Sequence, residues 1–131
     1  MSTVHSTTNS SAEKCSAFVA ASSSLVVLAY RGSTSEEQVK QEGLTNLANY
    51  FAYFKFQDLP VGAYWGELYE KLDEVLPIFT EAANKCPKCE LWVTGHSLGA
   101  AVASLAATEL AVKFPQLVYY TFGQPRVGYY E

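Results

Sequence analysis

Apolar residues in this chain fall into short runs separated by polar turns, a pattern that predicts alternating strands and helices. Two runs, 15–21 and 25–31 (LVVLAYR), are rich in valine and aromatic residues and flank a serine turn at 22–24, which predicts two strands. The second run has no polar alternation, so we expect its strand to be buried on both faces. Further strands are predicted over 90–94 (ELWVT) and 117–122 (LVYYTF).

Helical signals lie between these strands. Apolar residues recur every three or four positions over 64–84, which predicts an amphipathic helix that Pro77 would kink. The segment 98–114 begins with small side chains that would let a helix lie close to a sheet, and a capping box of Ser35 and Gln38 starts a shorter helix. This order of elements predicts an α/β fold in which a mostly parallel sheet is flanked by helices.

Two segments do not fit the alternation. Residues 1–14 are polar, and we expect them to be a disordered tail before a single domain over 15–131. Residues 44–56 carry five aromatic side chains within 50–56 and have no clear period. They fit a core strand or helix, or a mobile flap that offers apolar surface to a lipid.

Composition and charge exclude several classes of protein. The chain has 131 residues, of which 49% are hydrophobic and 17% charged, as in one globular domain. Acidic residues outnumber basic ones by 13 to 9, and the formal charge of −4 has the wrong sign for nucleic-acid binding. No apolar run is long enough for a transmembrane segment, and residues 1–14 lack the apolar core of a signal peptide.

The cysteines allow several interpretations. Since Cys15, Cys86 and Cys89 are three in number, at least one thiol is free or pairs with another molecule. The Cys-x-x-Cys at 86–89 offers two of the four ligands of structural zinc, and neither histidine lies at a ligand spacing from it. It follows a helical segment and precedes a strand, which disfavours a thioredoxin-type redox centre. A disulfide or plain loop thiols are favoured, and we expect no metal or cofactor.

The strongest chemical signal stands between a predicted strand and a predicted helix, where residues 95–99 have the sequence Gly-His-Ser-Leu-Gly. At such a junction G-x-S-x-G forms a strained turn that exposes the serine oxygen, and Gly95 and Gly99 leave room for it. Ser97 is therefore a candidate nucleophile. The Leu98 N–H, at the positive helix N-terminus, would face the oxyanion formed by its attack.

A second oxyanion donor is expected from the loop that follows the buried strand 25–31. Ser33 is the natural candidate there, because its N–H and hydroxyl would face Ser97 across the carboxyl edge of the sheet, where open α/β sheets bind ligands. The plainer alternative is an ordinary strand-to-helix turn with a serine N-cap.

Three motifs, YRGSTS at 30–35, VTGHSLGA at 93–100 and TFGQPRVG at 121–128, together resemble the fungal-type class 3 lipases of the α/β-hydrolase superfamily. The resemblance implies hydrolysis of acyl esters, typically triacylglycerols, by an extracellular protein. Ser97 matches the nucleophile of the family and Ser33 its oxyanion-hole serine.

The same resemblance bears on two other parts of the chain. It implies a surface lid, and with it transient contact with a lipid interface, within 34–56. His96 matches a motif position that is distinct from the catalytic histidine of the family. We interpret His96, with Gly95 and Gly99, as supporting or buried structure at the turn.

The remaining members of a catalytic triad are absent from this sequence. In α/β-hydrolases an acid and then a histidine follow the nucleophile. Residues 98–131 contain two acids, Glu109 and Glu131, and no histidine. Glu109 lies in the predicted helix on a face that cannot return to Ser97, and His5 lies in the polar tail. Loss of triad members removes about 10⁴- to 10⁶-fold of the rate.

These observations predict the N-terminal portion of a class 3 lipase-like domain, a partial α/β-hydrolase fold whose C-terminal strands are missing. The strand 117–122 would then be an exposed apolar edge. We expect a serine-type ester hydrolase by lineage that is inactive as this chain. The alternative is a catalytically inactive lipid-binding or interaction protein that keeps the turn around Ser97 as a relic.

Overall fold

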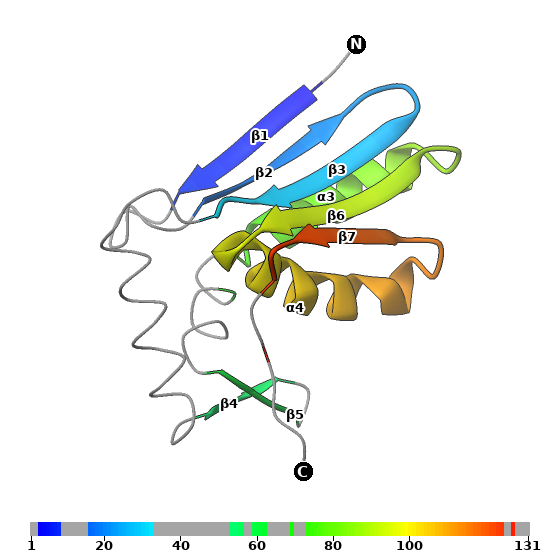
Figure 1. Cartoon of the computed structure of the whole chain (residues 1–131). Coiled ribbons are helices and arrows are strands. Elements are labelled where there is room, and N and C mark those ends of the chain that lie inside the picture. Colours follow the sequence, from blue (N-terminus) through cyan, green and yellow to red (C-terminus); the bar gives the residue numbers. More distant parts are fainter. Residues whose placement is uncertain are drawn as a thin grey trace.

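The computed structural model describes residues 3–8, 16–32, 53–56, 59–62, 69, 73–124 and 127. Most of its strands form one five-stranded sheet with the spatial order β1-β2-β3-β6-β7. These strands are β1 (Thr3–Thr8), β2 (Ser16–Ala21), β3 (Leu25–Tyr30), β6 (Glu90–His96) and β7 (Val118–Phe122). The first three are antiparallel neighbours, whereas β3, β6 and β7 run parallel (Figure 1).

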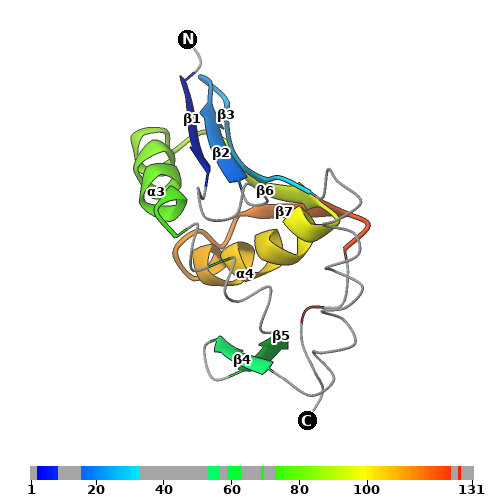
Figure 2. The ribbon, with the colours of Figure 1, turned by 90° about the vertical axis from the view of Figure 1, so that its left-hand side faces the viewer.

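Two helices cover one face of this sheet. They are α3 (Val75–Lys85), which contacts β2 and β3, and α4 (Leu98–Lys113), which contacts β3, β6 and β7. Figure 2 shows both helices on the same side of the sheet. Helix α3 leads into β6, and α4 connects β6 to the parallel strand β7, as a crossover between parallel strands requires. The predicted α/β fold is confirmed.

Alternation along the strands decides which side chains form the core. Val19, Leu28 and Val93 are cross-strand neighbours on the helix-covered face, and each is at most 1% exposed. Phe79 of α3 and Phe114 at the end of α4 meet edge to face, with ring centroids 6.1 Å apart. The core therefore lies between the sheet and the two helices.

The prediction of a disordered tail over 1–14 is wrong for residues 3–8, which form β1. This strand pairs with the whole length of β2, from Thr3 opposite Ala21 to Thr8 opposite Ser16. Threonine and valine favour extended backbone, and pairing with β2 satisfies backbone groups that a free tail would leave to water. A polar composition at a sheet edge was thus mistaken for disorder.

The helix predicted over 64–84 is observed in two described parts, Tyr69, which is helical, and α3, while residues 64–68 and 70–72 lie outside the described residues. Within the described residues, α3 begins at Val75, after a turn in which the Leu76 N–H donates to the Asp73 carbonyl at 3.1 Å. Pro77 lies in the first helical turn, where a backbone N–H has no intrahelical acceptor. Proline is tolerated at such a position, so Pro77 belongs to the start of the helix and does not interrupt its middle.

A small hairpin lies apart from the main sheet (Figure 1). It pairs β4 (Tyr53–Phe56) with β5 (Leu59–Gly62) in antiparallel register. Of the alternatives left open for 44–56, a strand is therefore observed at its last four residues. The rest of this segment and the short helix expected after Ser35 lie outside the described residues. Strand β5 was not predicted, because Pro60 interrupts its apolar run.

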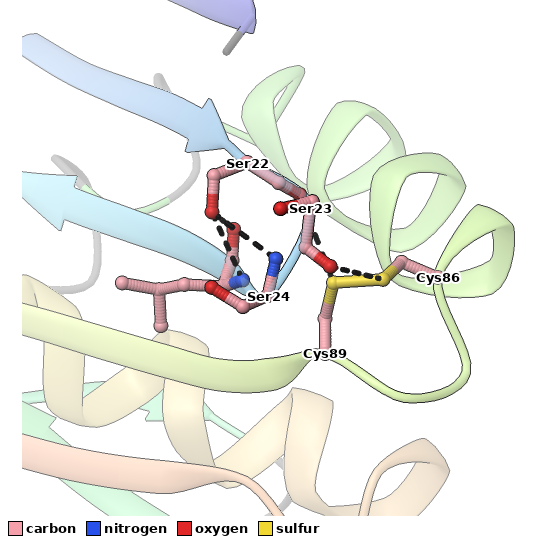
Figure 3. The surroundings of a disulfide bond; sticks show 6 residues. Ser22, Ser23, Ser24, Cys86 and Cys89 are labelled. Carbon is pink, nitrogen blue, oxygen red and sulfur yellow. Dashed lines mark hydrogen bonds between the residues drawn. A yellow bond between two sulfur atoms is a disulfide. The ribbon is translucent and has the colours of Figure 1, made fainter. Parts of the chain in front are cut away.

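A disulfide joins Cys86 to Cys89 in the connection from α3 to β6, with the Cα atoms 5.4 Å apart (Figure 3). Each sulfur lies 3.8 Å from a carbonyl oxygen of the turn at 22–24. The Glu90 N–H donates to the last carbonyl of that turn at 3.0 Å. Of the alternatives left open for this cysteine pair, the disulfide is the one observed.

Candidate functional site

The turn between β6 and α4 has the backbone that the Gly-His-Ser-Leu-Gly motif predicts. Ser97 has φ 55° and ψ −118°, and among the described residues it is the one non-glycine residue with a positive φ. An L-amino acid rarely adopts this conformation, and such strain is typical of functional turns. The Ser97 N–H donates to the Phe122 carbonyl at 2.9 Å, which ties the turn to the end of β7. The Ser97 side chain makes no capping hydrogen bond to α4.

Two glycines allow α4 to start this close to the sheet. A Cβ built on Gly95 would lie 2.4 Å from the carbonyl carbon and oxygen of Gly99. A Cβ on Gly99 would lie 2.1 Å from the carbonyl oxygen of Tyr30, at the end of β3. These atoms belong to the backbone and cannot rotate away, so both positions require glycine. The predicted structural role of the two residues is consistent with this packing.

The first candidate oxyanion donor is the N–H of Leu98, the first residue of α4. The first amides of a helix have no intrahelical acceptor, and they carry the positive end of the helix dipole. The carbonyl of Ser97 already accepts from Ala100 and Ala101, at 3.0 and 3.2 Å. The Leu98 N–H has no acceptor within the helix, so it is available to donate to an anion formed next to Ser97.

The second candidate donor, Ser33, lies outside the described residues, but the chain can be followed to the residue before it. A Cβ on Gly32 would lie 2.5 Å from the His96 carbonyl oxygen. The Arg31 N–H donates to the Ser16 carbonyl at 2.9 Å, which fixes the end of β3 against β2. The structure thus brings Gly32 to the residue next to Ser97.

His96 is exposed, which excludes the buried alternative of its interpretation and leaves the supporting one. It pairs with Phe122 across β6 and β7, on the sheet face opposite the two helices. Its ring lies between two glycines: a Cβ on Gly32 would be 3.4 Å from Nδ1, and one on Gly123 would be 3.6 Å from Nε2. The motif alone could not reveal its exposure, because exposure depends on which face the helices cover.

A cluster of polar side chains around Glu109 of α4 was missed from the sequence. The Tyr69 hydroxyl donates to Glu109 Oε2, and the nearby Tyr30 hydroxyl is buried without a hydrogen-bond partner among the described residues. Burial, and then the Glu109 carboxylate, raise the pKa of Tyr30. Burial and the hydrogen bond to Glu109 raise the pKa of Tyr69 well above its usual value. In the sequence, the one signal of this cluster was Tyr30, a residue with a polar hydroxyl at the end of a strand predicted to be buried.

Glu109 and Ser97 lie at opposite ends of α4. The glutamate lies in the last turns of α4, about 18 Å along the helix axis from Ser97 at 1.5 Å per residue. There it borders a groove of about 720 Å³ between α3 and α4, together with Asp73, Leu76 and Lys113. The role of Glu109 in this structure is to accept the Tyr69 hydrogen bond.

Two further features bear on binding. In the part of the chain that the structure describes, no three histidine, cysteine or acidic side chains gather closely enough to hold a metal ion. None of the described helices has both the length and the apolar run that crossing a bilayer requires.

Comparison with protein families and known proteins gives one consistent result. A family model described as Lipase (class 3) matches residues 27–131. The secreted mono- and diacylglycerol lipase A of Penicillium cyclopium is 36% identical over 115 residues, which are 80% of this chain and 34% of that protein. The chain therefore spans about a third of the length of this curated relative.

Solved structures have the same fold. A mutant of MDLA from Penicillium cyclopium has a TM-score of 0.74 at 31% identity, covering 97% of this chain and 48% of that one. Lip2 lipase from Yarrowia lipolytica has a TM-score of 0.81 at 24% identity, again covering 97% of this chain and 48% of the other, and this likeness concerns the fold alone. The described strands and helices thus correspond to about half of each solved chain.

Proposed function

The chain belongs to the class 3 lipase family, and we propose that it carries the nucleophile half of a serine-type acyl-ester hydrolase. Ser97 is the nucleophile in this proposal. The Leu98 N–H and Ser33 hold the oxyanion, and Gly95, His96 and Gly99 support the turn. The base and the acid that activate Ser97 come from outside the 131-residue sequence.

The strained backbone of Ser97 is the observation that carries the proposal. A positive φ at a non-glycine residue costs about 1–3 kcal/mol, and such a cost persists where the surroundings hold it in place. Here the Phe122 carbonyl and the glycine contacts at 95 and 99 hold it. A purely structural turn at this position would be more stable with glycine or asparagine, whereas a nucleophile requires the hydroxyl.

The proposed reaction has two halves. Ser97 Oγ attacks the ester carbonyl carbon while a base takes the hydroxyl proton, and the oxyanion of the tetrahedral intermediate accepts the Leu98 N–H. Collapse expels the alcohol, which receives that proton, and leaves an acyl group on Ser97. Water then attacks the acyl-enzyme by the same route and releases the carboxylic acid. Neither half requires a metal or an organic cofactor.

The base is not available from the two histidines of the sequence. His96 precedes the nucleophile in the same strand, and its ring lies beside Gly32 and Gly123 on the open face of the sheet. His5 lies in β1, which is separated from β6 by two strands in the sheet order. We therefore expect the 131-residue chain alone to be nearly inactive, at least about 10⁴-fold below a complete triad.

The substrate class proposed is a neutral acyl ester of glycerol, since the Penicillium relative is named a mono- and diacylglycerol lipase. An extracellular location is proposed on the same ground, because that relative is named as secreted. The disulfide at 86–89 is compatible with an oxidising compartment. Transient contact with a lipid interface through 34–56 remains part of the proposal.

The test is a chimera in which the matched segment of the Penicillium cyclopium lipase is replaced by residues 27–131 of this chain. We expect hydrolysis of a monoacylglycerol emulsion, with a loss of at least about 10⁴-fold in Ser97→Ala. Ser104→Ala is the matched control, because the Ser104 hydroxyl donates to the Ala101 carbonyl inside α4. Equal activity of the two serine variants, or a folded but inactive chimera, would refute the proposal.

One observation favours a second function. Since the sequence supplies no second histidine near Ser97, the chain could bind lipid or protein without catalysis and keep the turn as a relic. This alternative predicts that the isolated chain binds its ligand equally well with Ser97→Ala. Rapid phosphonate labelling and ester cleavage by the isolated 131-residue chain would exclude it.

A further inference from the structure

Three polar side chains meet where β7 ends. The hydroxyl groups of Tyr119 and Thr121 both donate to Oε1 of Gln124, the Thr121 bond at 2.9 Å. Tyr119 and Thr121 lie two positions apart on β7, so they share a face of the strand. The register places Tyr119 opposite the buried Val93, which makes this the face that the helices cover. We call Tyr119, Thr121 and Gln124 the β7 clamp, because their bonds tie the chain that leaves β7 to the strand itself.

A single residue, Gly123, separates the strand from Gln124. Its φ of 59° lies in the left-handed region, which glycine adopts about as easily as negative φ. Gly123 therefore does not by itself fix the orientation of the peptide unit between residues 122 and 123. Pairing of Phe122 with His96 holds this peptide unit on the side of the strand. The β7 clamp holds it on the other side.

This peptide unit is the one that contacts the candidate nucleophile. The Phe122 carbonyl accepts the Ser97 N–H at 2.9 Å, at the point where the carboxyl ends of β6 and β7 lie side by side (Figure 1). Rotation of the peptide unit about the Phe122 and Gly123 dihedrals would turn this oxygen away from the Ser97 amide. Because the Ser97 backbone is strained at φ 55°, it depends on contacts that hold it in place. The contacts are thus continuous from Gln124 to Ser97.

We propose that Gln124 is a positioning residue for Ser97. By accepting two hydroxyl groups, its side-chain oxygen fixes the peptide unit whose carbonyl holds the Ser97 amide. This rests on the proposed function, since the position of Ser97 affects a reaction only where Ser97 is the nucleophile. The plainer alternative is that the β7 clamp stabilises the end of the strand and has no influence on Ser97.

The chemistry of the side chain suggests matched variants. A carboxamide oxygen has two lone pairs and can accept from both hydroxyl groups. Gln124→Glu keeps an oxygen acceptor at the same distance from the backbone, whereas Gln124→Met has a similar length and offers only a weakly accepting sulfur. Gln116→Met is the matched control, because Gln116 is also exposed and lies before the opposite end of β7.

The first measurement is amide hydrogen exchange of the 131-residue chain by NMR, which requires no activity. We expect Gln124→Met to accelerate exchange of the Ser97 N–H about tenfold, because two neutral hydrogen bonds together contribute about this factor. The Phe114 N–H, which donates to the Leu110 carbonyl at the far end of α4, should exchange at the parent rate. Gln124→Glu and Gln116→Met should leave exchange at Ser97 unchanged.

The second measurement is hydrolysis of a monoacylglycerol by the chimera with the Penicillium cyclopium lipase. We expect Gln124→Met to lower kcat about tenfold and to change KM by less than about twofold, because a misplaced nucleophile weakens the transition state and not substrate binding. Gln124→Glu should recover most of kcat. Adding Tyr119→Phe and Thr121→Val to Gln124→Met should cause no further loss, since all three act through one oxygen.

Three outcomes of the exchange measurement would overturn the positioning role. They are an unchanged rate at Ser97 in Gln124→Met, equal acceleration in Gln116→Met, and equal acceleration at Ser97 and Phe114, which would mean general destabilisation. A higher KM at unchanged kcat would also overturn it, because Gln124 would then bind substrate. Failure of the proposed function has a different signature: the chimera keeps its activity in Ser97→Ala, whatever the exchange rates of the Gln124 variants.

Discussion

The two ends of β6 are stabilised by different means. At the amino end, the Cys86–Cys89 disulfide closes the entry into the strand, and the Glu90 N–H donates to the turn at 22–24. At the carboxyl end there is no disulfide among the described residues, and the Ser97 backbone is strained, with φ 55°. Contacts between backbone atoms of β3, β6 and α4 hold that end.

The difference shows where the chain tolerates change. At the amino end the residues of the turn at 22–24 are exposed, so we expect substitutions there to be tolerated. Backbone packing at the carboxyl end leaves no space for a methyl group, because a Cβ on Gly99 would lie 2.1 Å from the Tyr30 carbonyl oxygen. The end that carries the candidate chemistry is therefore the less tolerant one.

The largest effect is expected from Gly99→Ala. We expect it to lower the free energy of unfolding by about 3 kcal/mol, because the new methyl meets backbone that cannot move aside. Urea denaturation followed by circular dichroism measures this. Gly123→Ala is the control: its Cβ would lie 3.6 Å from the nearest atom, and the positive φ of 59° costs about 1 kcal/mol. Equal effects of the two substitutions would contradict the tight packing at Ser97.

Removal of the disulfide is expected to have the next largest effect. Cys86→Ser with Cys89→Ser should lower the free energy of unfolding by about 2 kcal/mol, a small value because the closed loop is short. Amide exchange should become faster at Glu90 and remain unchanged at Ala101. A reducing agent should add nothing to the double variant. Faster exchange at Ala101 would show that the two ends of β6 are coupled, against the comparison drawn above.

Ser97→Gly should stabilise the protein. Glycine adopts a positive φ without steric strain, so we expect about 1 kcal/mol of added stability, while Ser97→Ala keeps the strain and changes little. Thermal unfolding of the three proteins gives the comparison. If Ser97→Gly were destabilising, the strain at this turn would be absent and the main support for the proposed nucleophile would be lost.

The smallest effect at neutral pH concerns Tyr30 and Tyr69, the two tyrosines beside Glu109. Folding raises the pKa of Tyr30 and Tyr69 above the usual value of about 10, because burial and Glu109 disfavour the phenolate. Their contribution to stability is thus complete below about pH 10 and lost as the pH rises further. Tyr69→Phe should make the loss of stability between about pH 9 and about pH 11 less steep. A parallel decline in parent and variant would contradict this.

Local patterns were sufficient to predict the strands at β2, β3, β6 and β7, both helices on the sheet and the turn at Ser97. Each of these follows from a continuous apolar run or from a motif that requires one backbone conformation. The apolar spacing over 64–84 did not reveal the turn at 73–74 that precedes α3, because such spacing does not report where helical hydrogen bonds begin.

Features that depend on distant partners were not predictable. Strand β1 is polar and acquires its structure by pairing with β2. The exposure of His96 depends on which face of the sheet the helices cover. The contact between Tyr69 and Glu109 joins residues 40 positions apart. The position of Ser33 relative to Ser97 stays a prediction, because Ser33 lies outside the described residues.

The most direct test of the central claim is the site and rate of labelling by a fluorophosphonate, identified by peptide mass spectrometry. We predict that the chimera described above carries the label on Ser97, and that the isolated chain labels at Ser97 at least about 10⁴-fold more slowly because it lacks the base. Labelling of a different serine in the chimera, or an unchanged rate in Ser97→Ala, would contradict the assignment of Ser97 as the nucleophile.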